Sequence, residues 1–99
     1  MFDKLKNLNE MMRKAKEVKS ALSQISVESS AANGKIKMTF DGENMLKSLS
    51  IDDEYMDISK KGELEKHLKN CIQDGVKKSQ QEAAKKMKDI MGMDVPGLF

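Results

Sequence analysis

Apolar residues recur every three or four positions along the first 25 residues of the chain. The series consists of Leu8, Met11, Ala15, Val18, Leu22 and Ile25. Alternating spacings of three and four place these side chains on one face of an α-helix, as in the seam of a coiled coil. The pattern predicts a helix that begins near Asp3 and ends between Leu22 and Ile25. Its six apolar positions are our candidate seam for packing or dimerisation.

The hydrophobic period changes to two after this helix, which indicates strands. Residues 25–29 and 35–40 alternate between apolar and polar positions, and Asn33-Gly34 between them is a strong hairpin-turn signal. A second turn at residues 41–44 leads to a third alternating stretch. Its predicted inward face consists of Met45, Lys47, Leu49 and Ile51. We therefore expect a three-stranded antiparallel meander with one apolar face, which another element must cover.

A second helical pattern runs from about Lys61 to Met91. Its predicted apolar positions are Leu64, Leu68, Cys71, Ile72, Val76, Ala83, Met87 and Ile90. Gly75 lies in the middle of this pattern, and a glycine in a helix interior costs about 1 kcal/mol relative to alanine. We therefore expect a bend or break near it. Together the patterns predict an α+β fold in a single domain of residues 1–99: a long N-terminal helix, the meander and a long C-terminal helix.

Composition narrows the classes of protein to which this chain can belong. The 99 residues are 38% hydrophobic and include nine methionines but no tryptophan. Such a thin core favours self-association. No apolar stretch approaches the roughly 18 residues of a membrane span, and the charged N-terminus lacks the apolar core of a signal peptide. With a single cysteine, the chain fits a reducing compartment, and we expect a cytoplasmic protein.

Residues with catalytic or metal-binding potential are sparse. The single histidine, His67, lies four residues before the single cysteine, Cys71, so both share one helix face. Zinc requires at least two further ligands, which only a second copy of the chain could supply. No glycine-rich phosphate loop follows the turn glycines. The sequence therefore predicts a protein that is not an enzyme and that uses no metal, cofactor or small-molecule substrate.

Positive charge is concentrated at the two ends of the chain, although the net charge is only +2. Lysine and arginine on rigid helices can contact a row of DNA phosphates. The candidate DNA-contacting residues are Lys4, Lys6, Arg13, Lys14, Lys16, Lys77, Lys78, Lys85, Lys86 and Lys88. Only one of the 18 basic residues is arginine, the usual bidentate reader of guanine. We therefore expect contacts to the DNA backbone with weak sequence preference.

Several segments, in their order and spacing, carry a family resemblance. They are Leu8 with residues 11–15, residues 35–42, residues 49–52, residues 72–75 and the ending 91–97. Together they resemble the YbaB/EbfC family of bacterial nucleoid-associated proteins, with departures at Gln73-Asp74-Gly75 and in the glycine-poor turn at residues 29–34. The resemblance implies a tweezer-like homodimer with helical arms around a sheet-containing body. It also implies binding to double-stranded DNA at the nucleoid, with roles in nucleoid organisation and gene expression.

Two other functions remain open from the sequence. The seam and the methionine-rich surfaces could hold a partner helix, which would make the chain a protein–protein adaptor whose lysines only solubilise it. The basic amphipathic first helix could instead attach to a membrane surface. Phe2, however, is the only aromatic residue in that helix, so DNA remains the preferred partner and no membrane is expected.

Overall fold

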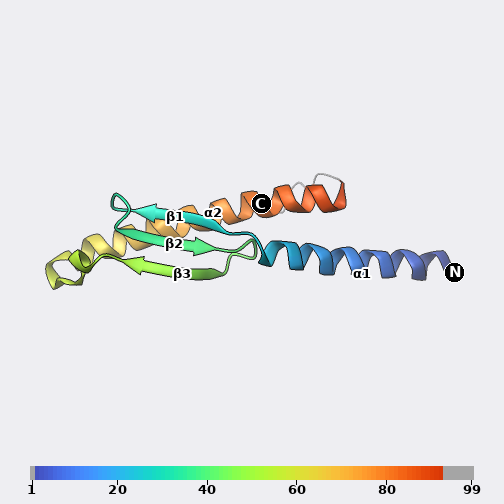
Figure 1. Cartoon of the computed structure of the whole chain (residues 1–99), viewed down its shortest axis with the longest axis horizontal. Helices are drawn as coiled ribbons and strands as arrows, with labels where there is room; N and C mark the ends of the chain where they lie inside the picture. Colours follow the sequence, from blue (N-terminus) through green and yellow to red (C-terminus); the bar gives the residue numbers. More distant parts are fainter. Residues whose placement is uncertain (1, 93–99) are drawn as a thin grey trace.

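Two long helices and a small sheet form an elongated molecule with extents of 67 × 21 × 17 Å (Figure 1). This computed structural model describes residues 2–92, with side chains from Lys6 onward. The elements in chain order are α1 (Phe2–Ser23), β1 (Val27–Ala31), β2 (Ile36–Phe40), β3 (Leu46–Ile51), η1 (Asp53–Met56), η2 (Ile58–Lys60) and α2 (Lys61–Met91). This order confirms the predicted α+β fold.

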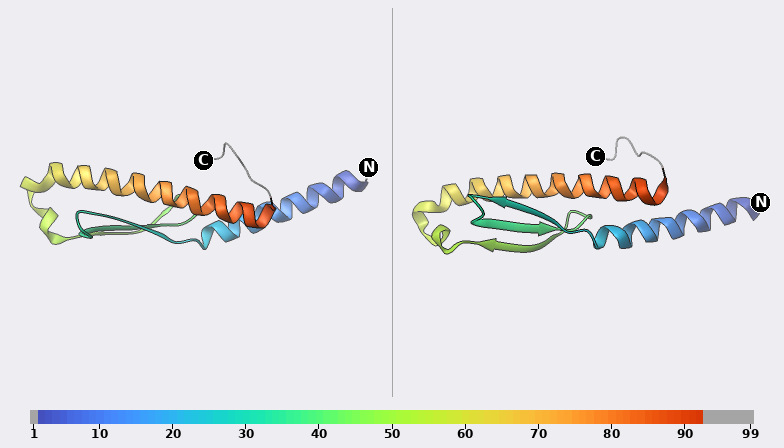
Figure 2. Two further views of the ribbon diagram at one scale, coloured as in Figure 1. Left: turned by 90° about the horizontal axis from the view of Figure 1, so that it is seen from above. Right: turned by 45° about the horizontal axis from the view of Figure 1, so that its top comes forward.

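The three strands form an antiparallel sheet in the order β1-β2-β3. Ala32, Asn33 and Gly34 adopt positive φ angles in the first turn, as the Asn-Gly signal predicted. On β2, Ile36 and Met38 are 0% and 1% exposed. Their burial confirms the predicted alternation, because α2 lies across β1 and β2 and covers this face of the sheet (Figure 2).

A β-bulge shifts the alternation along β3. Phe40 of β2 pairs with Leu46, and the residue before Phe40 pairs with Ser48, which leaves Lys47 between the two pairs. The predicted inward face is therefore wrong at Met45 and Lys47, since Leu46 takes the position opposite Phe40. A bulge inserts one extra residue and so reverses the inward and outward positions beyond it.

The helix-facing side of β3 is only partly covered. Paired residues of antiparallel strands share a face, so Leu46 and Leu49 lie on the same side of the sheet as Phe40 and Met38. Phe40 and Met38 are 3% and 1% exposed, whereas Leu46 and Leu49 are 46% and 50% exposed. β3 therefore presents an apolar surface that the single chain leaves open to solvent.

The helix α2 is continuous through Gly75, so the predicted bend or break there is wrong. Gly75 is buried, and a Cβ atom built on it would lie 2.1 Å from Cε2 of Phe40. The glycine is present because the aromatic ring needs its space. The other buried residues of α2 are Cys71, Ser79 and Ala83, so a stripe of small residues lets the helix lie close to the sheet.

Buried polar contacts fix how α2 lies on the sheet. The hydroxyl group of Ser29 on β1 lies 2.7 Å from the carbonyl oxygen of Cys71 and 2.9 Å from a carboxylate oxygen of Asp74. The Ser79 hydroxyl donates to the carbonyl oxygen of Asp41 at 2.5 Å. Each buried hydroxyl group thus has an acceptor, which avoids the desolvation cost of an unsatisfied polar group.

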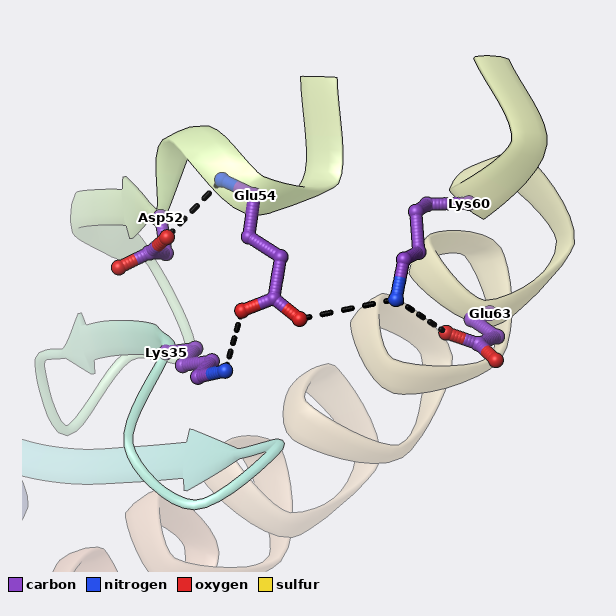
Figure 3. Close-up of polar contacts among 5 residues, drawn as sticks. All are labelled: Lys35, Asp52, Glu54, Lys60 and Glu63. Atoms are coloured by element: carbon purple, nitrogen blue, oxygen red, sulfur yellow. Dashed lines mark hydrogen bonds and ion pairs between the residues drawn. The ribbon is translucent and has the colours of Figure 1, made fainter. Parts of the chain in front are cut away.

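Ion pairs connect η1 with the sheet and with the start of α2 (Figure 3). The Glu54 carboxylate pairs with Lys35 and, at 3.6 Å, with Lys60, which also lies 3.9 Å from Glu63. The Asp52 carboxylate accepts the N–H of Glu54 at 2.9 Å. Exposed pairs of this kind contribute about 0–1 kcal/mol each. The network therefore orients the chain reversal at this end more than it stabilises the fold.

Candidate nucleic-acid interface

The two helices extend together beyond the sheet and form an arm (Figures 1 and 2). We define the arm as α1 together with the part of α2 that follows Ser79. At its base the N–H of Gly42 donates to the carbonyl oxygen of Leu22 at 2.8 Å. A Cβ atom on Gly42 would lie 2.8 Å from the same oxygen, so only glycine allows this close approach of backbone to backbone.

The arm carries the positive charge of the molecule. It contains nine lysine or arginine residues and five acidic residues, so its net charge is +4. Residues 24–79, in contrast, contain nine basic and ten acidic residues, which gives a net charge of −1. The sequence places these basic segments at opposite ends of the chain. The fold brings them side by side (Figure 1), which concentrates positive potential on one elongated surface.

The candidate basic residues from Lys6 onward are exposed. Those on α1 are Lys6, Arg13, Lys14 and Lys16, and those on α2 are Lys77, Lys78, Lys85, Lys86 and Lys88. The side chain of Lys4 lies outside the described residues. Lys77 and Lys78 precede Ser79 and therefore lie where α2 still covers the sheet. The remaining candidates lie on the arm.

Contacts within the chain distinguish candidate lysines that are held by the fold from those that are available to bind a phosphate. The Lys78 ammonium group lies 3.1 Å from the Asp74 carboxylate and donates to the carbonyl oxygen of Glu28 at 3.2 Å, so it links α2 to β1. Lys85 pairs with Glu82 at 3.3 Å on the exposed surface of the arm, where solvent and salt weaken the attraction. Lys85 can therefore exchange its partner for a phosphate more easily than Lys78 can.

The predicted seam of α1 is covered only near the base of the arm. Its exposed members are Leu8, Met11 and Ala15, and its covered or partly covered members are Val18, Leu22 and Ile25. Val18 is 9% exposed, whereas Leu8 and Met11 are 53% and 67% exposed. The inner half of the seam therefore packs within the chain, and the outer half remains open.

Asp41 is a positioning residue at the base of the arm that the sequence indicated only as part of a turn. Its carboxylate accepts the N–H groups of Glu43 at 2.8 Å and Met45 at 3.1 Å, and Lys47 lies 3.4 Å away. Burial opposes the charge of this carboxylate, but the two hydrogen bonds and Lys47 together lower the pKa of Asp41 below its usual value. The sequence signal that could have indicated this role is the Asp-Gly pair directly after a buried strand.

His67 and Cys71, the pair with metal-ligand spacing, have packing environments instead. His67 makes an edge-to-face contact with Tyr55, with ring centroids 5.8 Å apart. Cys71 is 1% exposed in the core. Within residues 2–92, no group of three or more histidine, cysteine, aspartate or glutamate residues could hold a metal ion. In that same part of the chain, no helix combines the length and apolarity that crossing a membrane requires.

The basic arm and the order of elements agree with a known family. Residues 1–94 match the model of the YbaB/EbfC DNA-binding family. The chain belongs to this family. Membership confirms the resemblance in the sequence.

Individual relatives resemble this YbaB/EbfC protein over almost its whole length. A nucleoid-associated protein of Dictyoglomus thermophilum is 27% identical over 100 residues, which cover 99% of this chain and 96% of the relative. One from Desulforamulus reducens is 28% identical and covers 94% of this chain and 96% of its own. The crystal structure of an uncharacterized Helicobacter pylori protein shares the fold, with a TM-score of 0.76 at 22% identity, over 93% of this chain and 98% of that one.

Proposed function

We propose that this YbaB/EbfC family member is a non-enzymatic, nucleoid-associated protein that binds duplex DNA through its arm. The observation that carries the proposal is the arm's net charge of +4, together with the exposure of its basic side chains from Lys6 onward. Family membership and the names of the curated relatives support the same partner. The proposed location is the nucleoid, where the protein would influence DNA organisation and gene expression.

The arm would act mainly through the DNA backbone. Its positive groups are almost all lysines, which act as point charges and do not form the bidentate pairs by which arginine reads guanine. Each phosphate that a lysine neutralises releases counterions, so affinity falls steeply as salt rises. Two helices hold these groups at fixed spacing, which favours a row of phosphates over an isolated anion.

We further propose that two copies associate through the open surface of β3. Asp74 and Lys78 reach β1 from one flank of α2, so helical geometry turns Ile72, on the other flank, toward β3. Ile72 is 43% exposed, and Leu46 and Leu49 on β3 are about half exposed. A second copy would cover this apolar surface, as stable interfaces do. The two arms, which lie at the other end of the molecule, would then double the basic surface.

The DNA contacts are tested by reversing charge on the arm. We expect Lys85→Glu/Lys86→Glu to lose most of its affinity for a fluorescent duplex, measured by anisotropy across a salt series. The matched control is Lys37→Glu/Lys66→Glu, which changes the net charge equally on exposed residues outside the arm. Equal losses in both variants would refute contact through the arm. The absence of wild-type binding to any duplex at 50 mM salt would refute DNA binding itself.

The dimer is tested by placing a charge on β3. We expect Leu49→Asp to convert a dimer into an 11 kDa monomer in sedimentation equilibrium at micromolar concentration. Met12→Asp is the matched control, because Met12 is similarly exposed, at 54%, but lies on the arm. A monomeric wild type, or a Leu49→Asp variant that stays dimeric, would contradict the proposed interface. Circular dichroism of both variants checks that each remains folded.

A further inference from the structure

An apolar groove lies between the two helices of the arm. It is lined by Met11, Lys14, Ala15, Val18, Met87 and Met91, and its volume is about 320 Å³. Five of these six residues are apolar, and Lys14 supplies the single charge. The groove includes Met11 and Ala15 from the open half of the seam, and it lies on the arm, apart from the β3 surface. It is therefore an apolar site that the proposed dimer does not use.

We propose that residues 93–99 of the same chain dock in this groove. This segment lies outside the described residues and follows Gly92, which comes directly after the groove residue Met91. Five of its seven residues are apolar: Met93, Val95, Pro96, Leu98 and Phe99. Its only charged residue is Asp94, whose sign complements that of Lys14. The segment thus matches the groove in both apolarity and charge.

Chain geometry permits this docking. Gly92 has a φ of 69° and donates its N–H to the carbonyl oxygen of Lys88 at 2.8 Å, so α2 ends at the groove with a left-handed cap. Seven extended residues reach up to roughly 23 Å. The distance along α1 from Met11 to Val18 is only about 10 Å at 1.5 Å per residue. The segment can therefore span the groove without any change in the helices.

The size of the groove favours this segment over a second copy of the chain. A volume of about 320 Å³ is at the lower end of the range for small-ligand pockets, roughly 300–1,000 Å³. The side chains of a short segment are therefore enough to fill it. Covalent attachment gives the segment a high effective concentration beside the groove. Methionine side chains are flexible and adapt to an aromatic or aliphatic guest.

Methionine methyl NMR on the full-length protein tests the docking. Met11, Met87 and Met91 line the groove, whereas Met45 and Met56 lie elsewhere. If the ring of Phe99 enters the groove, Leu98→Ala/Phe99→Ala will shift the methyl resonances of the three groove methionines. The resonances of Met45 and Met56 will stay in place and serve as the internal control.

A change on the groove side gives the reciprocal test. Ala15 is exposed, so Ala15→Glu keeps the helix but places a charge in the apolar site. We expect it to remove nuclear Overhauser effects between the Phe99 ring and the groove methyl groups. Unchanged groove resonances in Leu98→Ala/Phe99→Ala would overturn the proposal. So would nuclear Overhauser effects that disappear on dilution, because these would identify a second copy as the occupant. Neither result depends on DNA binding.

Discussion

Gly75→Ala tests whether the long helix contains this glycine for packing reasons. Three ring atoms of Phe40 would lie 2.1, 2.5 and 3.0 Å from the new Cβ atom. Carbon atoms pack at about 3.5–4.0 Å, so the ring must move by more than about 1 Å. Phe40 is 3% exposed and is surrounded by the core, which leaves little room for that movement.

Two opposing effects determine the size of the change. Overpacking a core costs about 1–3 kcal/mol, and the separations place this substitution in the upper part of that range. Replacing a glycine in a helix interior by alanine returns about 1 kcal/mol through helix propensity. We therefore expect a net loss of about 1–2 kcal/mol in the free energy of unfolding. For a domain of this size, that loss lowers Tm by roughly 5–15 °C.

Urea and thermal unfolding, followed by circular dichroism at one protein concentration, measure the effect. Gly62→Ala is the matched control, because it lies in the same helix and its Cβ would meet nothing within 4 Å. It should be neutral or stabilising by up to about 1 kcal/mol. In a Phe40→Leu background, Gly75→Ala should cost much less, since the ring is absent. A Gly75→Ala protein as stable as the wild type would refute this account of the glycine.

Three further changes test the base and the surface of the arm. Ser79→Ala removes the buried donor to the Asp41 carbonyl and should cost about 1–3 kcal/mol in urea unfolding; no loss would mean that another group satisfies this oxygen. The folded-state pKa of Asp41 is lowered, so its carboxylate stabilises the fold above about pH 4, and this contribution disappears as the pH falls through the lower, folded-state value. Asp41→Asn should therefore be less stable at pH 7 and lose less stability below pH 4; parallel pH profiles would contradict this role. In DNA binding, Lys85→Glu/Lys86→Glu should reduce the slope of log affinity against log salt by about 0.9 for each phosphate that the variant no longer neutralises, whereas an unchanged slope would show that these lysines are not at the interface.

Patterns that repeat along the chain predicted the secondary structure well. The three-and-four spacing of α1 and the alternation of Ile36, Met38 and Phe40 depend on local geometry, and burial confirms the alternation on β2. The bulge opposite Phe40 could not be predicted, because it depends on how two strands pair. The reason for a glycine at position 75 could not be predicted either, because the Phe40 ring that needs its space lies 35 residues away in sequence.

The candidate nucleic-acid interface likewise has features that could be predicted from local sequence patterns and features that could not. The helices, the sheet, the family resemblance and the basic character of both ends could be predicted from the sequence, because periodicity, turn chemistry and charge are properties of neighbouring residues. Three features became visible only in the folded chain: the basic ends lie side by side in one arm, Lys78 contacts β1, and Leu46 and Leu49 remain exposed. These features depend on which surfaces meet when distant segments pack, and no local pattern records that choice.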